Sequence, residues 1–113
     1  MNEKFLKNIE FSKVQTLSDL VSYQEGQVVS KTFVQNSNIS ITLFAFDKDE
    51  EISTHASGGD AMILALDGQG EITIDGEKFT VNQGETIVMP ANIPHAVFAS
   101  KQFKMLLTVV FKS

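Results

Sequence analysis

The chain has two histidines, His55 and His95, and no cysteine. Imidazole is the commonest protein ligand for metal ions and the side chain that exchanges protons near neutral pH, so these residues are the first candidates for chemistry. The lack of cysteine excludes disulfides, thiolate metal sites, iron–sulfur clusters and a cysteine nucleophile. An isolated histidine near the end of a strand is more often an ordinary polar residue, so the surrounding sequence has to decide.

His55 opens the stretch HASGGDAMILALDG, in which Asp60 adds a carboxylate. The serines at 53, 57 and 100 lack the glycines of a nucleophile elbow, so no Ser-His-Asp triad is predicted. The stretch GQGEITIDG is rich in glycine but lacks the strand–loop–helix setting of a phosphate-binding loop. Histidine chemistry is therefore the kind that the sequence favours.

Short β-strands must position these histidines. QVVSKTFV and ISITLFAF are rich in β-branched and aromatic residues, and the turn cluster QNSN separates them. Asp75-Gly76, between EITI and KFTV, is typical of a two-residue hairpin turn, in which both central residues need positive φ. About eight to ten strands at intervals of roughly 8–12 residues predict an all-β sandwich or barrel.

The chain is predicted to be one domain, with an N-terminal extension over about residues 1–26 and a barrel over about residues 27–111. Phe11, Val14, Leu17, Leu20 and Val21 lie close to helical spacing, which indicates a short helix or a turn in the extension.

The two histidines lie in segments that resemble the two motifs of the cupin superfamily. In GETIVMPANIPHAVFA, the residues Gly84, Pro90 and His95 match the second motif in register. Asn92 stands where that motif has its second glycine, and Ala99 where it has its asparagine. The resemblance spans roughly residues 40–110 and implies an antiparallel double-stranded β-helix, the jelly-roll barrel of the cupins.

The first motif, in DEEISTHASGGDAMILALDG, departs further from the family pattern. His55 and Gly68 match, but Asp49 replaces the opening glycine, Ser57 the second histidine and Ala61 the glutamate. In the family, three histidines and a glutamate hold a divalent metal, so two of four ligand positions remain here.

The resemblance implies a possible cofactor, a divalent metal such as Zn, Ni, Mn or Fe, held by His55 and His95 with waters. Asp60 is a further candidate ligand, on condition that Gly58 and Gly59 form a bulge that turns it inward. The competing interpretation is a metal-free interior pocket. Whichever holds, the predicted pocket is lined by His55, Ser57, Ile63, Met89, His95 and Val97.

Composition limits the partners. The formal net charge of −5, with scattered basic residues, argues against nucleic acid, which needs clustered Lys and Arg. The N-terminal residues lack the apolar segment of a signal peptide, and the apolar runs are too short to span a bilayer, so a cytoplasmic protein is expected and no membrane partner. Apolar strands such as QVVSKTFV and MLLTVVF predict a homodimer, with the N-terminal segment reaching toward the partner copy.

Two function classes follow from the sequence. One is a binding module that takes a small polar ligand in the barrel. The other is a metal-dependent oxygenase, isomerase or lyase acting on a small molecule. The sequence leaves the reaction and the ligand open.

Overall fold

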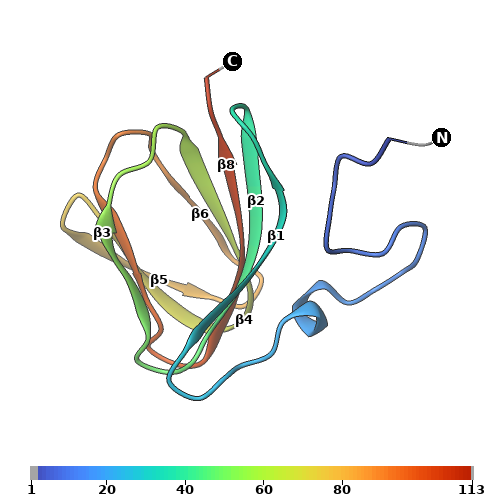
Figure 1. Ribbon diagram of the computed structural model, residues 1–113. Coiled ribbons are helices and arrows are strands. Elements are labelled where there is room, and N and C mark those ends of the chain that lie inside the picture. Colours follow the sequence, from blue (N-terminus) through green and yellow to red (C-terminus); the bar gives the residue numbers. More distant parts are fainter. Residues whose placement is uncertain (1–2, 113) are drawn as a thin grey trace.

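Eight β-strands and one short 3₁₀ helix make up the computed structural model, which describes residues 3–112. Figure 1 shows the strands curled into a barrel from which the N-terminal segment projects. The elements in chain order are η1 (Leu17–Leu20), β1 (Val28–Gln35), β2 (Ile39–Phe46), β3 (Glu51–His55), β4 (Asp60–Ile74), β5 (Glu77–Asn82), β6 (Thr86–Met89), β7 (His95–Phe98) and β8 (Phe103–Val110). The all-β prediction is confirmed, and no helix among the described residues is long and apolar enough to cross a membrane.

All strand pairs are antiparallel, in the order β1-β2-β8-β4-β7-β3, with β5 and β6 also pairing with β4. The predicted hairpin joins β4 to β5, and Asp75 and Gly76 have φ of 50° and 83°. These are the left-handed conformations that the Asp-Gly pair tolerates best.

β4 is 15 residues long and turns the corner of the barrel. Its first half pairs with β6 and β8, and its second half with β5 and β7. An irregularity between Ala65 and Asp67 separates the two halves. Gly68 follows with φ of 73°, and a Cβ there would lie 1.6 Å from the Gln102 carbonyl oxygen. Only glycine fits at this corner.

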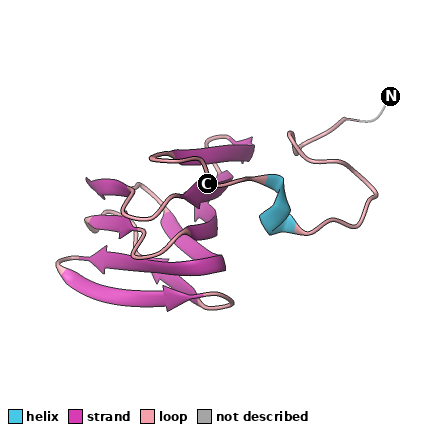
Figure 2. Cartoon of the chain, turned by 90° about the horizontal axis from the view of Figure 1, so that it is seen from below, coloured by secondary structure: helices cyan, strands magenta, loops and turns pink. Residues whose placement is uncertain are grey.

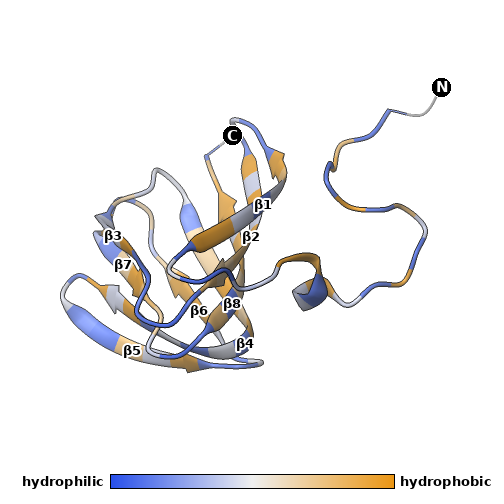
Figure 3. Cartoon of the chain, turned by 60° about the horizontal axis from the view of Figure 1, so that its bottom comes forward, coloured by the Kyte–Doolittle hydropathy of each residue, from blue (hydrophilic) through white to orange (hydrophobic). Residues whose placement is uncertain are grey.

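Alternation along the strands builds the barrel core. In β4, Ala61, Ile63 and Ala65 are buried, whereas Met62 and Leu64 are exposed. Inward residues from the other strands complete a cluster that we call the barrel core: Phe46, Ala61, Ile63, Ala65, Ile72, Val81, Met89, Val97, Ala99, Phe103, Met105 and Val109. Figure 3 shows apolar residues recurring along the barrel strands, as period-two patterning requires.

A second apolar cluster lies on the outer side of β1 and β2. Its buried members are Val21, Phe33, Leu43 and Ala45, and we call it the outer cluster. Ile9, Leu17 and Leu20 of the extension pack against it, together with Leu106 and other partly buried residues of the sheet. β2 is therefore covered on both faces, by the barrel core on one side and by the extension on the other.

The extension is mostly irregular, as Figure 2 shows. Of the residues at helical spacing, only Leu17 and Leu20 lie in a helix, the single turn η1, while Val14 is fully exposed. Tyr23 ties the extension to the barrel, because its hydroxyl donates a 2.5 Å hydrogen bond to the Asp67 carboxylate. Lys104 Nζ lies 5.0 Å from the Tyr23 ring centroid and donates a 2.7 Å bond to the Ser18 carbonyl.

Candidate functional site

The structure brings His55 and His95 together. His55 ends β3 and His95 begins β7, and the two residues are direct partners in the antiparallel β3–β7 pair. Their ring centroids are 4.4 Å apart, with an angle of 70° between the ring planes. The geometry therefore makes one site of two residues that are far apart in the chain.

A β-bulge creates this pairing. Ile52 is opposite Val97, so a regular ladder would place Thr54 opposite His95, but the register shifts between Ile52 and His55. The extra residue in β3 moves His55 into the partner position, because a one-residue shift reverses which side chains share a face. No turn residue or glycine marks this bulge in the sequence, so sequence reasoning missed it.

Both rings are oriented in the same way by the backbone. His55 Nδ1 lies 2.9 Å from the Ser53 carbonyl oxygen, and His95 Nδ1 lies 3.2 Å from the Ile93 carbonyl oxygen. A carbonyl only accepts, so in the neutral rings each Nδ1 carries the proton and each Nε2 keeps a free lone pair. The pair thus offers two Nε2 acceptors or metal ligands in fixed orientations.

The two histidines differ in burial. His95 is 3% exposed, whereas His55 is an exposed residue at the strand end. Burial lowers the pKa of His95, the neighbouring His55 lowers it further, and the bond to the Ile93 carbonyl partly opposes both effects. His95 is therefore neutral near pH 7, the form that can accept a hydrogen bond or bind a metal.

Asp60 and Ser57 are engaged in the neighbouring loops. Asp60 Oδ1 accepts a 2.8 Å hydrogen bond from the Ala91 amide, so this carboxylate holds the loop before β7. Ser57 Oγ accepts from the Gly59 amide at 3.2 Å, and its carbonyl accepts from the Asn92 amide at 2.7 Å. These contacts give both residues a loop-fixing role beside the histidine pair.

Three residues predicted to line the pocket lie in the barrel core. Ile63, Met89 and Val97 expose 0%, 1% and 2% of their surface, so protein atoms surround them. A ligand would have to displace core side chains to reach them. A surface hollow of about 440 Å³ next to the Asp60 loop is lined in part by Asn92 and Phe111, and neither histidine lines it. The polar groups of the site are therefore the two imidazoles at the strand ends.

The motif positions that cupins give to glycine keep their backbone geometry here. Gly68 and Gly84 have φ of 73° and 87°. Asp49 and Asn92, which replace glycines, have φ of 73° and 64°. Asp and Asn enter this left-handed region more readily than other non-glycine residues. The motifs therefore retain their turns although ligand residues have been replaced.

The donor set suits a weakly held ion at most. Ala61 occupies the family's glutamate position and is 1% exposed in the core. Within residues 3–112, no group of three or more His, Cys, Asp or Glu side chains could hold a metal ion. Two neutral imidazoles supply two coordinate bonds and no negative charge, fewer than a resident zinc site uses.

The pattern of the cupin domain family matches residues 42–111. SPY1581, a Streptococcus pyogenes protein of unknown function, is 47% identical in sequence to this chain. The superposition on its crystal structure covers 98% of this chain and 97% of the S. pyogenes chain, with a TM-score of 0.97. A Desulfitobacterium hafniense cupin superfamily protein is 31% identical, covering 95% and 98%, with a TM-score of 0.90.

A cupin 2 conserved barrel domain protein from Leptotrichia buccalis is 46% identical. The match covers 82% of this chain and 45% of the L. buccalis chain, with a TM-score of 0.81. The family match extends over more than half of the chain and includes both histidines and the hairpin between them. The structural relatives carry the same barrel. This chain therefore belongs to the cupin superfamily.

Proposed function

We propose that this cupin binds a small polar molecule at the His55–His95 pair. The observation that carries the proposal is the shared orientation of the two rings, each with Nδ1 against a backbone carbonyl. Two Nε2 lone pairs on adjacent rings accept hydrogen bonds from a ligand that carries hydroxyl or amine donors. The ligand class is therefore a small molecule with two neighbouring donors, such as a vicinal diol.

The two histidine rings have different expected roles in ligand binding, because they differ in exposure. His55 is exposed and can meet a ligand directly, whereas His95 is buried and held neutral. A buried neutral acceptor discriminates strongly, because a ligand that lacks the matching donor leaves it unpaired. His95 is accordingly the residue expected to set selectivity, and His55 the one expected to set access.

A weak divalent-metal site is the second candidate, because the Nδ1 bonds also match the way metal-ligating histidines are oriented. His55 and His95 would hold the ion, with water in the remaining positions. When bound, such an ion supplies a Lewis acid with positions open to a small molecule. Asp60 is not expected to contribute, because no three His, Cys, Asp or Glu side chains within residues 3–112 are placed to share a metal ion.

Nuclear magnetic resonance of the imidazole nitrogens tests both candidates on the full chain at about pH 7.5. D-glucose serves as the vicinal-diol probe, and Zn²⁺ and Ni²⁺ serve as the metal probes on chelator-treated protein. Saturable shifts of both Nε2 signals with glucose support the proposal. The substitutions His55→Phe and His95→Phe each abolish the response, while Asp60→Asn, which keeps an acceptor for Ala91, leaves it unchanged.

Metal binding has a separate readout. An ion at a hundredfold its dissociation constant adds about 2.7 kcal/mol to the folded state, which raises the melting temperature by several degrees in a domain of this size. A metal response without a glucose response would replace the proposal by the second candidate. Unmoved Nε2 signals with every probe would overturn both.

A further inference from the structure

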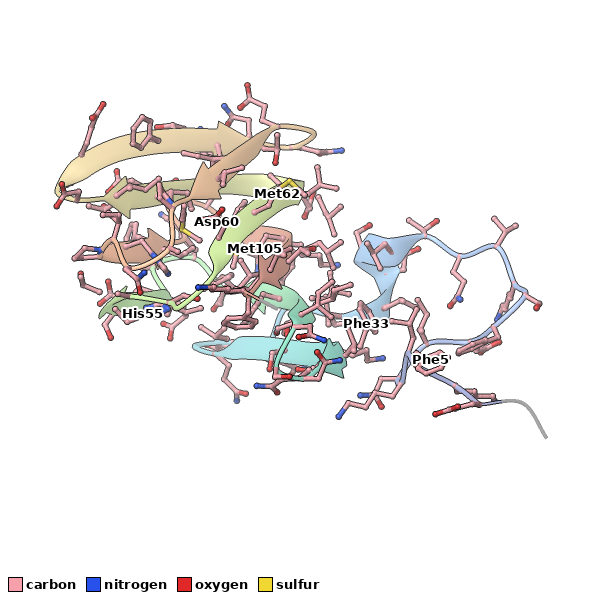
Figure 4. All side chains as sticks on the ribbon, turned by 90° about the horizontal axis from the view of Figure 1, so that it is seen from above. Phe5, Phe33, His55, Asp60, Met62 and Met105 are labelled. Carbon is pink, nitrogen blue, oxygen red and sulfur yellow. The ribbon has the colours of Figure 1, made fainter. Side chains whose placement is uncertain are left out.

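The hollow beside Asp60 is a candidate site of its own at the rim of the barrel. Its volume of about 440 Å³ is within the range of roughly 300–1,000 Å³ that small-molecule sites occupy. Three segments line it: residues 58–60 at the start of β4, residues 91–92 in the loop before β7, and residues 110–112 at the end of β8. Neither histidine of the candidate site lines it. Figure 4 labels Asp60 and His55, which lie at different points of this rim.

Hydrogen bonds hold these three segments to one another. Asp60 and Val110 are ladder partners at the place where β4 pairs with β8. The Ala91 amide donates to Asp60 Oδ1 at 2.8 Å, and the Asn92 amide donates to the Ser57 carbonyl oxygen at 2.7 Å. The walls of the hollow are therefore fixed in place, so a ligand does not have to order the chain in order to bind.

The glycine pair leaves one wall of the hollow without side chains. A Cβ at Gly59 would lie 2.4 Å from the Val110 carbonyl oxygen and 3.0 Å from Phe111 Cδ1, so this position has to be glycine. A Cβ at Gly58 would meet only Phe111 Cδ1, at 4.0 Å. Val110 is 55% exposed and Phe111 is half-buried, so their side chains give the hollow an apolar surface. Because the glycines carry no side chains, this apolar surface stays uncovered on their side.

Opposite charges line the hollow beside the apolar surface. Oδ1 of Asp60 already accepts from the Ala91 amide, which leaves Oδ2 to accept from a ligand. Lys112 contributes an ammonium group, and Asn92 contributes an exposed amide. In the part of the chain that the structure describes, neither Asp60 nor Lys112 takes part in an ion pair. A ligand that carries both charges and an apolar group therefore matches this lining.

We propose that this hollow is a second small-molecule site, which binds a zwitterionic amino acid with an apolar side chain. The ammonium group of the ligand donates to Asp60 Oδ2 and its carboxylate accepts from Lys112, while its side chain packs on Val110 and Phe111. A carboxylate without an ammonium group is repelled by Asp60, and an amine without a carboxylate is repelled by Lys112, so the two charges together give selectivity. The site does not depend on what the histidine pair binds.

Titration of the isotope-labelled full chain with L-leucine at about pH 7.5 tests the proposal. The readout is the nuclear magnetic resonance of the backbone amides of Gly58, Asn92 and Lys112, which should shift and saturate. Three analogues each lack one part of leucine: 3-methylbutylamine lacks the carboxylate, 4-methylpentanoate lacks the ammonium group, and glycine lacks the side chain. Each analogue is expected to bind at least about tenfold more weakly than leucine, because it leaves one part of the lining unmatched.

Two substitutions separate this site from the histidine pair. Asp60→Asn keeps an acceptor for the Ala91 amide but removes the charge, and it should raise the dissociation constant of leucine about tenfold. Lys112→Gln should raise it about threefold, because an exposed ion pair contributes less. Lys101→Gln, at an exposed lysine in the loop before β8, is the matched control and leaves leucine binding unchanged. The response of the histidine rings to glucose should survive Asp60→Asn, so the two sites can fail independently.

Saturable binding of leucine that weakens in Asp60→Asn and in all three analogues supports the proposal. Three results would overturn it. The absence of a saturable shift up to about 20 mM leucine would show that the hollow is only a depression of the surface. Equal affinity for 3-methylbutylamine would show a site for amines rather than for zwitterions. Unchanged leucine binding in Asp60→Asn would place the amino acid elsewhere on the chain.

Discussion

The barrel core and the outer cluster use the same kinds of side chain but differ in how they are closed. Phe46, Ile63, Ile72, Phe103 and Met105 of the barrel core are all 0% exposed, and strands of one chain enclose them completely. The outer cluster is enclosed only where the extension reaches, and Met62, Leu64 and Val88 on β4 and β6 stay exposed beyond it. The barrel interior is therefore filled by apolar side chains, the two histidines of the candidate site lie at strand ends, and the exposed apolar residues lie on the outer face.

The largest expected effect distinguishes the two clusters. Phe103→Ala removes a fully buried ring whose edge packs on Gly70, and it should lower the free energy of unfolding by about 3–5 kcal/mol. Phe33→Ala in the outer cluster should cost less, because the irregular extension can move into the space left by the ring. Urea denaturation at one protein concentration measures both values, and an equal or greater loss for Phe33→Ala would contradict the comparison.

A smaller effect is expected at Tyr23, which joins the extension to the barrel. Tyr23→Phe removes the hydrogen bond to the Asp67 carboxylate and should cost about 1–2 kcal/mol at pH 7. Burial first, and then the Asp67 carboxylate, raise the pKa of Tyr23 well above its usual range.

The raised pKa also gives Tyr23 an alkaline signature. Because the folded state holds the phenol proton more tightly than the unfolded state, stability falls as pH rises above about 10. Tyr23→Phe should flatten this part of the dependence of unfolding free energy on pH. A variant whose alkaline dependence equals that of wild type would show that Tyr23 does not join the two parts in this way.

The smallest effect is expected at His95, at the edge of the barrel core. Its lowered pKa means that the unfolded state binds a proton more readily than the folded state below pH 6.5. The free energy of unfolding therefore increases as the pH rises through the range just below 6.5, and it decreases as the pH falls through that range. Comparing the urea midpoints of wild type and His95→Gln at about pH 7.5 and 5.5 should show a weaker pH dependence in the variant. Equal dependence in the two proteins would rule out His95 as its source.

The sequence by itself determined the elements of this protein, because their signals are local. Alternating apolar residues specify strands, and Asp75-Gly76 specifies the hairpin that the structure contains. The motif register of Gly68, Gly84, Pro90 and the two histidines indicated the cupin barrel from the sequence alone. The structure agrees, because Asp49 and Asn92 adopt the left-handed geometry of the glycines that they replace.

Tertiary structure alone decided how those elements meet. The bulge that aligns His55 with His95 depends on the pairing of β3 with β7, two strands distant in sequence. Asp60, at the start of β4, reaches the Ala91 amide in the loop before β7 through a contact that no local pattern encodes. Whether an apolar residue is enclosed, as Ile63 is, or left open, as Met62 is, depends on which remote strands and segments cover its face. Period-two patterning assigns a residue to a face, but only packing decides what covers that face.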